Sequence, residues 1–203
     1  MLLHLWITAY LRPDLAALSE PYGSKGLVMR TIAIVGGVVL VLVAGFFLFI
    51  YSGIYNMAAT EPHTMPVRWV MTTVKQNSIR VRAKDIVAPV ISESAQIHRG
   101  LALYQDLCLL CHGAPGISPT QIGVGILPTP PFLAAQGRDW SPAELYWVIK
   151  YGLKFAGMPS FGLKLEEQDL WALVAFLTQL PTLSPREYYQ MVQIAEATQP
   201  RSP

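Results

Sequence analysis

The stretch Cys108-Leu109-Leu110-Cys111-His112 decides how the chain is interpreted, because it forms a C-x-x-C-H motif. Two thiols three residues apart can each add across a vinyl group of one haem, and the adjacent His can then bind the iron. At this spacing one helical turn carries both thiols and the imidazole. The motif therefore predicts one haem c, attached covalently through Cys108 and Cys111, with His112 as an iron ligand.

Two other uses of this motif fit the sequence less well. A thioredoxin-like redox pair follows a β-strand and needs no adjacent His. A structural zinc site needs two more ligands at short spacing. The chain has only two cysteines, and no His-x₃₋₅-His pattern follows them. The sequence favours haem attachment over both alternatives.

The composition indicates one ordinary domain with an additional apolar segment. Of 203 residues, 52% are hydrophobic and 14% are charged, which is apolar for a soluble protein. Residues 31–60 contain no charge, and 32–51 alone would form about 30 Å of helix, the thickness of a hydrocarbon core. We predict a transmembrane anchor over residues 31–55. A cleaved signal peptide is the alternative, since Met57-Ala58-Ala59 offers small residues to a peptidase.

The segments on either side of this anchor differ in character. Residues 1–30 are predicted to be a cytoplasmic extension, and a start of translation at Met29 is the competing and favoured interpretation, because Arg30 directly precedes the apolar run. Residues 56–92 are predicted to be a basic amphipathic connector with a helix over Val67–Asp85. We expect its basic side to face away from its apolar side, and the helix to lie on anionic headgroups or on its own domain. The net charge of +2 and the lack of a basic block argue against nucleic acid as a partner.

Residues 93–182 are expected to form the haem domain. One helix begins near Ser92 or Ser94 and runs into the motif. A capping box at Ser141–Glu144 begins a second helix, which ends at Gly152. Glu166–Leu180 is expected to form a third. A loop rich in Gly and Pro lies between the first two, and residues 183–203 are predicted to be a polar C-terminal tail with a short surface helix.

These residues resemble the class I monohaem c-type cytochromes in their membrane-anchored bacterial form. The resemblance covers about residues 93–182 and rests on the C-x-x-C-H motif and on Gly157-Met158-Pro159. It implies an all-α, cytochrome c-like haem domain with one N-terminal transmembrane helix. It also implies that Gly100, Tyr104 and Trp171 lie where the first and last helices cross, and that residues 127–131 form a loop flanking the haem.

The second axial ligand has several candidates: Met158, His63, His98, Met191 or no protein ligand. Met158 stands between a Gly that permits close approach and a Pro that stiffens the chain, so the sequence favours it. A methionine of the hydrophobic core is the alternative for this residue. His112 and Met158 are therefore the expected iron ligands.

With both axial positions filled, the iron has no open site for a substrate. The resemblance thus implies an electron carrier, not an enzyme, that exchanges single electrons with a membrane oxidase, reductase or dehydrogenase. A fixed haem-bearing subunit of such a complex is one alternative, and a haem enzyme or gas-binding protein with a displaceable sixth ligand is another. Since c-type haem is attached outside the cytoplasm, the resemblance also implies a single-pass protein of the bacterial inner membrane with its haem domain in the periplasm.

Overall fold

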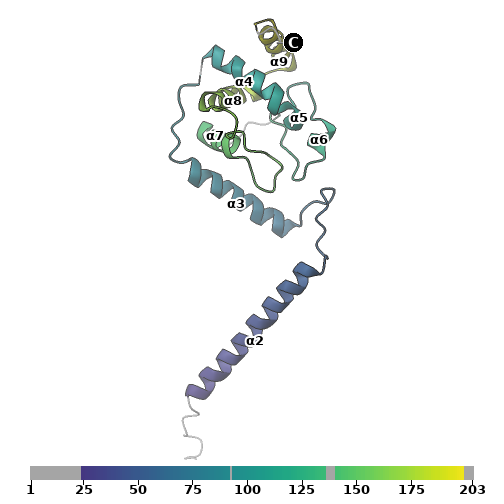
Figure 1. The fold of residues 1–203 in the computed structure, drawn as a ribbon, viewed down its shortest axis with the longest axis vertical. Coiled ribbons are helices and arrows are strands. Elements are labelled where there is room, and N and C mark those ends of the chain that lie inside the picture. Colours follow the sequence, from purple (N-terminus) through teal and green to yellow (C-terminus); the bar gives the residue numbers. More distant parts are fainter. Residues whose placement is uncertain (1–23, 92, 136–139, 199–203) are drawn as a thin grey trace, which may run out of the picture. The chain divides into compact units, whose positions relative to one another are not determined.

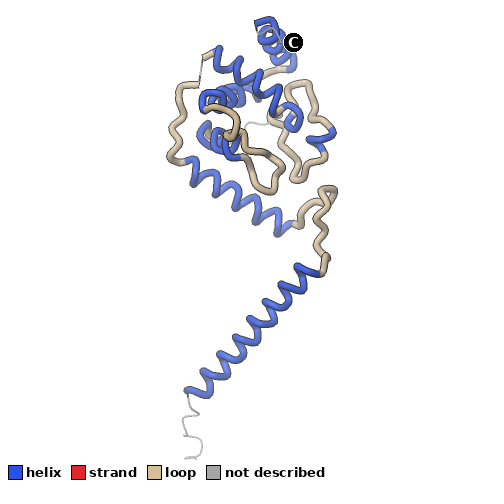
Figure 2. The backbone as a smooth tube through the Cα atoms, in the orientation of Figure 1, coloured by secondary structure: helices blue, strands red, loops and turns tan. Residues whose placement is uncertain are grey.

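The fold is all-α, as predicted. The computed structural model describes residues 24–91, 93–135 and 140–198, and over these residues it contains helices and two isolated β-bridges but no strand (Figures 1 and 2). The chain divides after Met57 into two units. Most of the predicted extension over residues 1–30 lies outside the described residues, and the predicted domain boundaries stay predictions.

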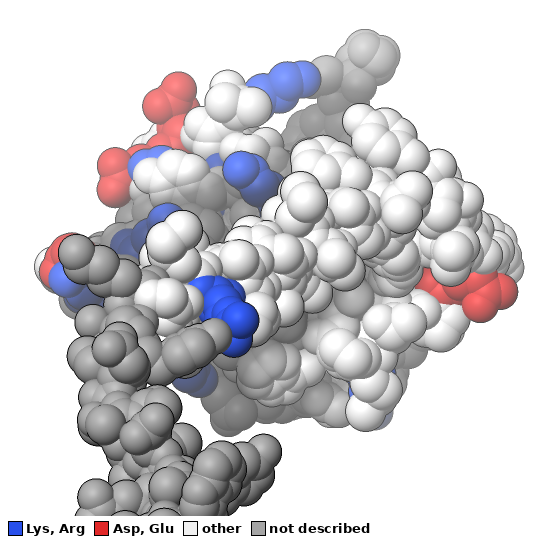
Figure 3. Space-filling model, turned by 90° about the horizontal axis from the view of Figure 1, so that it is seen from below, with Lys and Arg blue, Asp and Glu red and all other residues white. Residues whose placement is uncertain are grey.

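The first unit contains helix α2, Ser24–Tyr51. Its segment Gly26–Tyr51 is long and apolar enough to cross a membrane, and none of it is buried. The helix ends where the Ser52 hydroxyl donates to the carbonyl of Phe49 (2.7 Å) and Gly53 turns to a φ of +67°. Uncharged side chains also dominate the face of the molecule drawn in Figure 3.

The second unit begins with α3, Met65–Ala83, close to the predicted helix. Ile79 and Ala83 are buried, and α3 packs against α7, Pro142–Tyr151. The prediction that the basic side faces away from the apolar side was wrong. Three basic residues at heptad spacing, Arg68, Lys75 and Arg82, line the same cavity as Met71 and Ile79. Residues seven apart share a helix face, so these cations turn toward α7 together with the apolar side chains.

The core of this unit is centred on α4, Ser94–Leu107, and α8, Glu167–Gln179. A Cβ on Gly100 would overlap the backbone of Ala172 and lie 2.8 Å from Phe176 Cβ, so only Gly permits this crossing. The Tyr104 ring lies 5.2 Å from the ring of Phe176. At the edge of the crossing, the Arg99 guanidinium donates two hydrogen bonds to Asp169 (2.8 and 3.0 Å).

Trp171 has a neighbour that the sequence analysis did not predict. It stacks on Tyr146 of α7 at 4.2 Å between ring centroids, with 17° between the ring planes. Phe176, five residues further along α8, provides the aromatic contact to Tyr104 on α4. Trp171 therefore joins α7 to α8, and this contact adds a third helix to the core.

The ends of α7 follow the predicted capping box. The Ser141 hydroxyl accepts from the Glu144 backbone N–H (3.3 Å), and the Ser141 N–H donates to the Glu144 carboxylate (2.8 Å). At the other end Gly152 has a φ of +67°. The helix therefore begins and ends at the residues that the local sequence specifies.

The C-terminal segment is more ordered than a polar tail. After the 3₁₀ turn Leu180–Thr182, helix α9 covers Pro185–Thr198 and contacts α4. The Ser184 N–H and hydroxyl both donate to the Glu187 carboxylate at its start (2.8 and 2.6 Å). Tyr188 is buried. The prediction of a short surface helix did not foresee this packing.

Candidate functional site

The C-x-x-C-H motif continues the helical path of α4 through a short helix, α5, Leu109–His112. The N–H of Cys108 donates to the carbonyl of Tyr104 (2.9 Å), and the N–H of His112 donates to the carbonyl of Cys108 (2.9 Å). Gly113 ends the turn with a φ of +64°. Cys108, Cys111 and His112 are thus held on consecutive helical turns, each partly buried, as the spacing predicted.

The orientation of His112 is fixed by the loop that follows the motif. His112 Nδ1 lies 2.8 Å from the backbone carbonyl oxygen of Pro131. A carbonyl can only accept, so Nδ1 carries the proton and donates. The other ring nitrogen, Nε2, is then left with the lone pair that binds a metal.

Close contacts hold this loop against the motif. A Cβ on Gly113 would lie 2.5 Å from Phe132, the residue after Pro131, and 2.6 Å from the Ile117 carbonyl oxygen. The Tyr104 hydroxyl, buried under the turn, donates to the Gly113 carbonyl (2.6 Å). These contacts place the Pro131 carbonyl against the imidazole, so they set the position of the ring as well as its tautomer.

Met158 lies on a tight turn after α7. The Leu153 N–H donates to the Met158 carbonyl (3.1 Å), closing a loop with Phe155 and Gly157 at positive φ. A Cβ on Gly152 would lie 2.7 Å from the Met158 carbonyl oxygen, so the two chain segments touch there. The turn therefore presents Met158 from a stiff backbone, in agreement with the expectation drawn from its Gly and Pro neighbours.

A short segment connects the Met158 turn to the C-x-x-C-H motif. It includes helix α6, Gln121–Val124. A Cβ on Gly123 would lie 2.8 Å from Cys111 Cα, and a Cβ on Gly157 would lie 2.7 Å from Ile126 Cγ2. Residues 123–126 therefore contact the motif at one end and the Met158 turn at the other.

Both thiols are free and partly buried. Burial and, to a smaller extent, the neighbouring Cys111 raise the pKa of the Cys108 thiol to about 12. A thiol with this pKa is not the reactive thiolate that a redox pair requires. Among the described residues, no three His, Cys, Asp or Glu side chains converge as a zinc site would need.

The donor set fits a haem. Two thiols lie one helical turn apart, an imidazole beside them carries its lone pair on Nε2, and a thioether lies on a stiff turn that residues 123–126 connect to the motif. Apolar side chains next to the motif, including Leu107, Leu110 and Phe132, are each more than a third exposed and offer the surface that a porphyrin covers.

The other candidate ligands lie elsewhere in the second unit. His63 lines the cavity beside α3. His98 is on α4, ten residues before the motif, and its Nδ1 is buried without a hydrogen-bond partner among the described residues. Met191 is on α9 and packs against the core. The Pro131 carbonyl is the one functional group that sequence reasoning missed, because nothing in a Pro-rich loop shows which of its carbonyls meets the imidazole.

Comparison with known proteins agrees with this geometry. Residues 95–177 match the family described as cytochrome c oxidase, cbb3-type, subunit III. The chain contains a c-type cytochrome domain. The matched residues run from α4 through the motif and the Met158 turn into α8, so the cytochrome domain includes all four predicted site residues.

The c-type cytochrome domain also has a relative in a larger protein. The chain is 27% identical over 133 residues to the quinohemoprotein alcohol dehydrogenase of Comamonas testosteroni. The aligned part covers 63% of this chain but only 18% of that protein. No solved structure matches the chain.

Proposed function

We propose that the protein is a membrane-tethered electron carrier with one haem c. Cys108 and Cys111 would hold the haem by thioether bonds, and His112 and Met158 would be its axial ligands. The observation that carries the proposal is the hydrogen bond from His112 Nδ1 to the Pro131 carbonyl (2.8 Å), beside two free thiols on the same helical stretch. This hydrogen bond orients the imidazole and leaves the lone pair on Nε2, the nitrogen that would bind the iron.

A bound haem supplies a one-electron ferric/ferrous couple at this site. The residues of the chain would adjust that couple. The Pro131 carbonyl makes the imidazole a stronger electron donor to the iron by accepting a hydrogen bond from its Nδ1–H. A thioether from Met158 favours ferrous iron, and the apolar core under the motif disfavours the additional charge of the ferric state. The thioether and the apolar core support a relatively high reduction potential, which the stronger imidazole donor lowers in part. Two axial ligands leave no iron position for a substrate.

The membrane part of the proposal rests on α2. A helix of 28 residues, whose described side chains are all exposed, is long enough to serve as an uncleaved anchor. We assign its N-terminus to the cytoplasm and the second unit to the periplasm of a bacterial inner membrane, because c-type haem is attached outside the cytoplasm. The partners would be membrane oxidases, reductases or dehydrogenases.

The test is an absorption spectrum of the ferric protein purified from membranes. A low-spin spectrum with a sulfur-to-iron charge-transfer band at the red edge would support His/Met ligation. A high-spin spectrum would contradict it and favour a haem enzyme or gas-binding protein. A haem that is extracted from the denatured protein by acidified organic solvent would contradict covalent attachment.

A second candidate is a fixed haem-bearing subunit of a dehydrogenase complex. It is favoured by the similarity to one part of a quinohemoprotein alcohol dehydrogenase. Extraction in mild detergent followed by a native gel distinguishes the two. A haem-staining band at the size of this chain supports the tethered carrier, whereas a band that contains a dehydrogenase supports the fixed subunit.

A further inference from the structure

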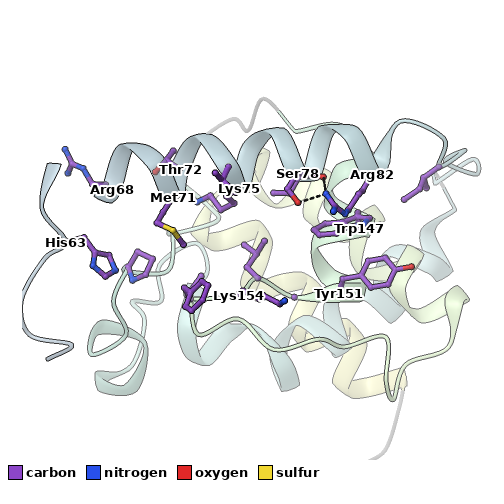
Figure 4. A pocket seen from close by; sticks show the side chains of 18 residues that line it. His63, Arg68, Met71, Thr72, Lys75, Ser78, Arg82, Trp147, Tyr151 and Lys154 are labelled. Carbon is purple, nitrogen blue, oxygen red and sulfur yellow. Dashed lines mark hydrogen bonds between the residues drawn. The ribbon is translucent and has the colours of Figure 1, made fainter. Parts of the chain in front are cut away.

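A cavity of about 830 Å³ lies between α3 and the turn that follows α7, outside the C-x-x-C-H motif. Figure 4 shows side chains entering it from both sides, with Lys75 and Arg82 on α3 and with Trp147 and Tyr151 on α7. Lys154 enters from the turn that leads to Met158. The electron-transfer proposal gives this cavity no role.

The charged part of the cavity lining is entirely basic. Arg68, Lys75 and Arg82 come from α3 and Lys154 from the opposite side, and the described residues that line the cavity include no Asp or Glu. Arg82 is held in place by Ser78, whose hydroxyl accepts a hydrogen bond from its guanidinium (2.9 Å). Within the described part of the chain, neither Lys75 nor Lys154 forms an ion pair. These cations line one cavity, and no ion pair to any of them is found among the described residues, so they favour an anionic occupant.

Much of the rest of the lining is apolar. Met71, Val74 and Ile79 come from α3, and Trp147 and Phe155 from the other wall. Phe155 is 76% exposed and has a φ of +57°, a backbone conformation that a bulky residue rarely adopts. A ring held at the edge of a cavity in an unfavourable conformation is an observation that a ligand would explain, because the ligand would cover the ring.

We propose that this cavity binds one anionic phospholipid. Its phosphate would meet Lys75, Arg82 and Lys154, and the first part of an acyl chain would lie along Met71, Val74, Trp147 and Phe155. The inference rests on α2 being a membrane anchor, as proposed above. α3 begins 14 residues after α2 ends, so even a fully extended chain keeps its start within about 46 Å of the end of α2.

The combination of charge and depth favours a lipid over an acidic protein. A protein surface would be recognised by the basic side chains alone, and it would leave the apolar walls of a cavity of this size unfilled. An anionic lipid would pair with the basic side chains and also fill the apolar walls, since it joins a phosphate to a hydrocarbon chain.

The experiment measures lipid binding to the full-length, haem-loaded protein in neutral detergent by native mass spectrometry. Phosphatidylglycerol and phosphatidylcholine with the same acyl chains are titrated separately. We expect a first phosphatidylglycerol to bind more tightly than any phosphatidylcholine. The double variant Lys75→Gln/Arg82→Gln should weaken that first binding by roughly 30-fold, two charges at about 1 kcal/mol each.

The matched control is Arg80→Gln/Lys84→Gln, which removes the same charge from the same region of the chain outside the cavity. Lipids that coat α2 are affected equally by both double variants, so only the difference between them reports on the cavity. Equal losses in the two variants, or no loss in either, would overturn the proposal. Because binding is measured in detergent, it can still be measured if α2 turns out to be cleaved. Cleavage of α2 would disprove the membrane anchor, and the lipid affinities would still test the cavity.

A second variant, Phe155→Gly, tests the apolar wall while keeping every charge. Glycine suits the positive φ, so the fold should be kept, and the affinity for phosphatidylglycerol should fall while that for glycerol phosphate does not change. Inorganic phosphate that binds as tightly as the lipid would show a simple anion site and overturn the proposal. A poly-glutamate peptide that displaces the lipid at lower concentration would overturn it in favour of an acidic protein partner.

Discussion

The hydrogen bond between His112 and Pro131 shows how a backbone group can select the chemistry of a side chain. An imidazole in water exchanges its two tautomers freely, and either nitrogen can then bind a metal. A carbonyl at 2.8 Å from Nδ1 removes that freedom. Nε2 is then the nitrogen with the lone pair before any metal binds. The iron would therefore bind an imidazole whose tautomer and orientation are already set.

The two cysteines are expected to hold one haem by two thioether bonds. Replacing Cys108 or Cys111 with Ala should leave at most one bond, because each thiol can react with one vinyl group. The denatured variant should then show a pyridine haemochrome spectrum shifted from that of the wild type, as an unreacted vinyl group lengthens the conjugation. An unchanged spectrum in either variant would contradict the covalent assignment.

Met158→Ala should convert a low-spin haem into a high-spin or exogenous-ligand-binding one. The reduction potential should fall by a fraction of the roughly 0.8 V over which axial ligands act, because a thioether favours ferrous iron. Met191→Ala is the matched control, since it removes the same side chain from α9. Loss of the low-spin spectrum in the Met191 variant alone would transfer the ligand role to that residue, and retention in both would point to His63 or His98.

The site was predictable to the extent that neighbours in sequence determine it. The motif, its helical path and the stiff turn around Met158 follow from short stretches of sequence, and the structure agrees with each of these local features. The Pro131 carbonyl was not predictable, because its contact with His112 spans 19 residues of loop. That contact depends on the packing of Phe132 on Gly113, which no periodicity records.

The crossing of α4 and α8 is tied by an ion pair whose pH dependence can be stated. A hydrogen bond from Arg99 and, to a smaller extent, its charge hold the pKa of Asp169 below its ordinary value of 3.8. The pair therefore stabilises the fold above the unfolded-state pKa, and this contribution is lost as the pH falls through the lower folded-state pKa.

Asp169→Asn should accordingly lower the free energy of unfolding at pH 7 by about 1 kcal/mol or less, since the pair is partly exposed. Urea unfolding followed by circular dichroism from pH 7 to pH 3 measures the difference between variant and wild type, which should shrink toward zero at the acidic end. Glu167→Gln removes a carboxylate from the same turn outside the pair and should show no such trend. A difference that stays constant with pH would show that Asp169 acts by packing.

At the scale of helices, the sequence predicted where a helix begins and ends, but it did not predict which face of a helix packs against which neighbour. The capping box at Ser141 and the terminator at Gly152 specify α7 because both act within one turn. The faces of α3 were misjudged because its basic residues have stems that can line an apolar cavity with their charges at the rim. The stacking of Trp171 on Tyr146 of α7 was not predicted, because helical spacing does not show which neighbouring helix a core aromatic ring contacts.

The relation of α3 to the cytochrome domain matters for how the whole chain can exchange electrons. A connector packed on α7 by Ile79 and Ala83 restricts the haem domain more than a free linker of the same length. Residues 84–91, between α3 and α4, are not helical, and Val87 and Val90 there are 88% and 83% exposed. Any hinge between α3 and α4 would therefore lie in these residues.

Limited trypsin digestion of the membrane-bound protein tests this arrangement. Cleavage after Lys84, the first residue past α3, should be faster than cleavage after Lys75, because a packed helix must open locally before a protease can bind it. The cut at Lys84 should release a soluble fragment that begins at Asp85 and keeps its haem spectrum, since α4, α7 and α8 form their core without α3. Haem staining of the supernatant and pellet, with the fragment mass, measures both outcomes. Equal rates at Lys75 and Lys84 would show that α3 is a loose tether, and haem that remains in the pellet after complete cleavage would show that the domain is held to the membrane by a contact other than α2.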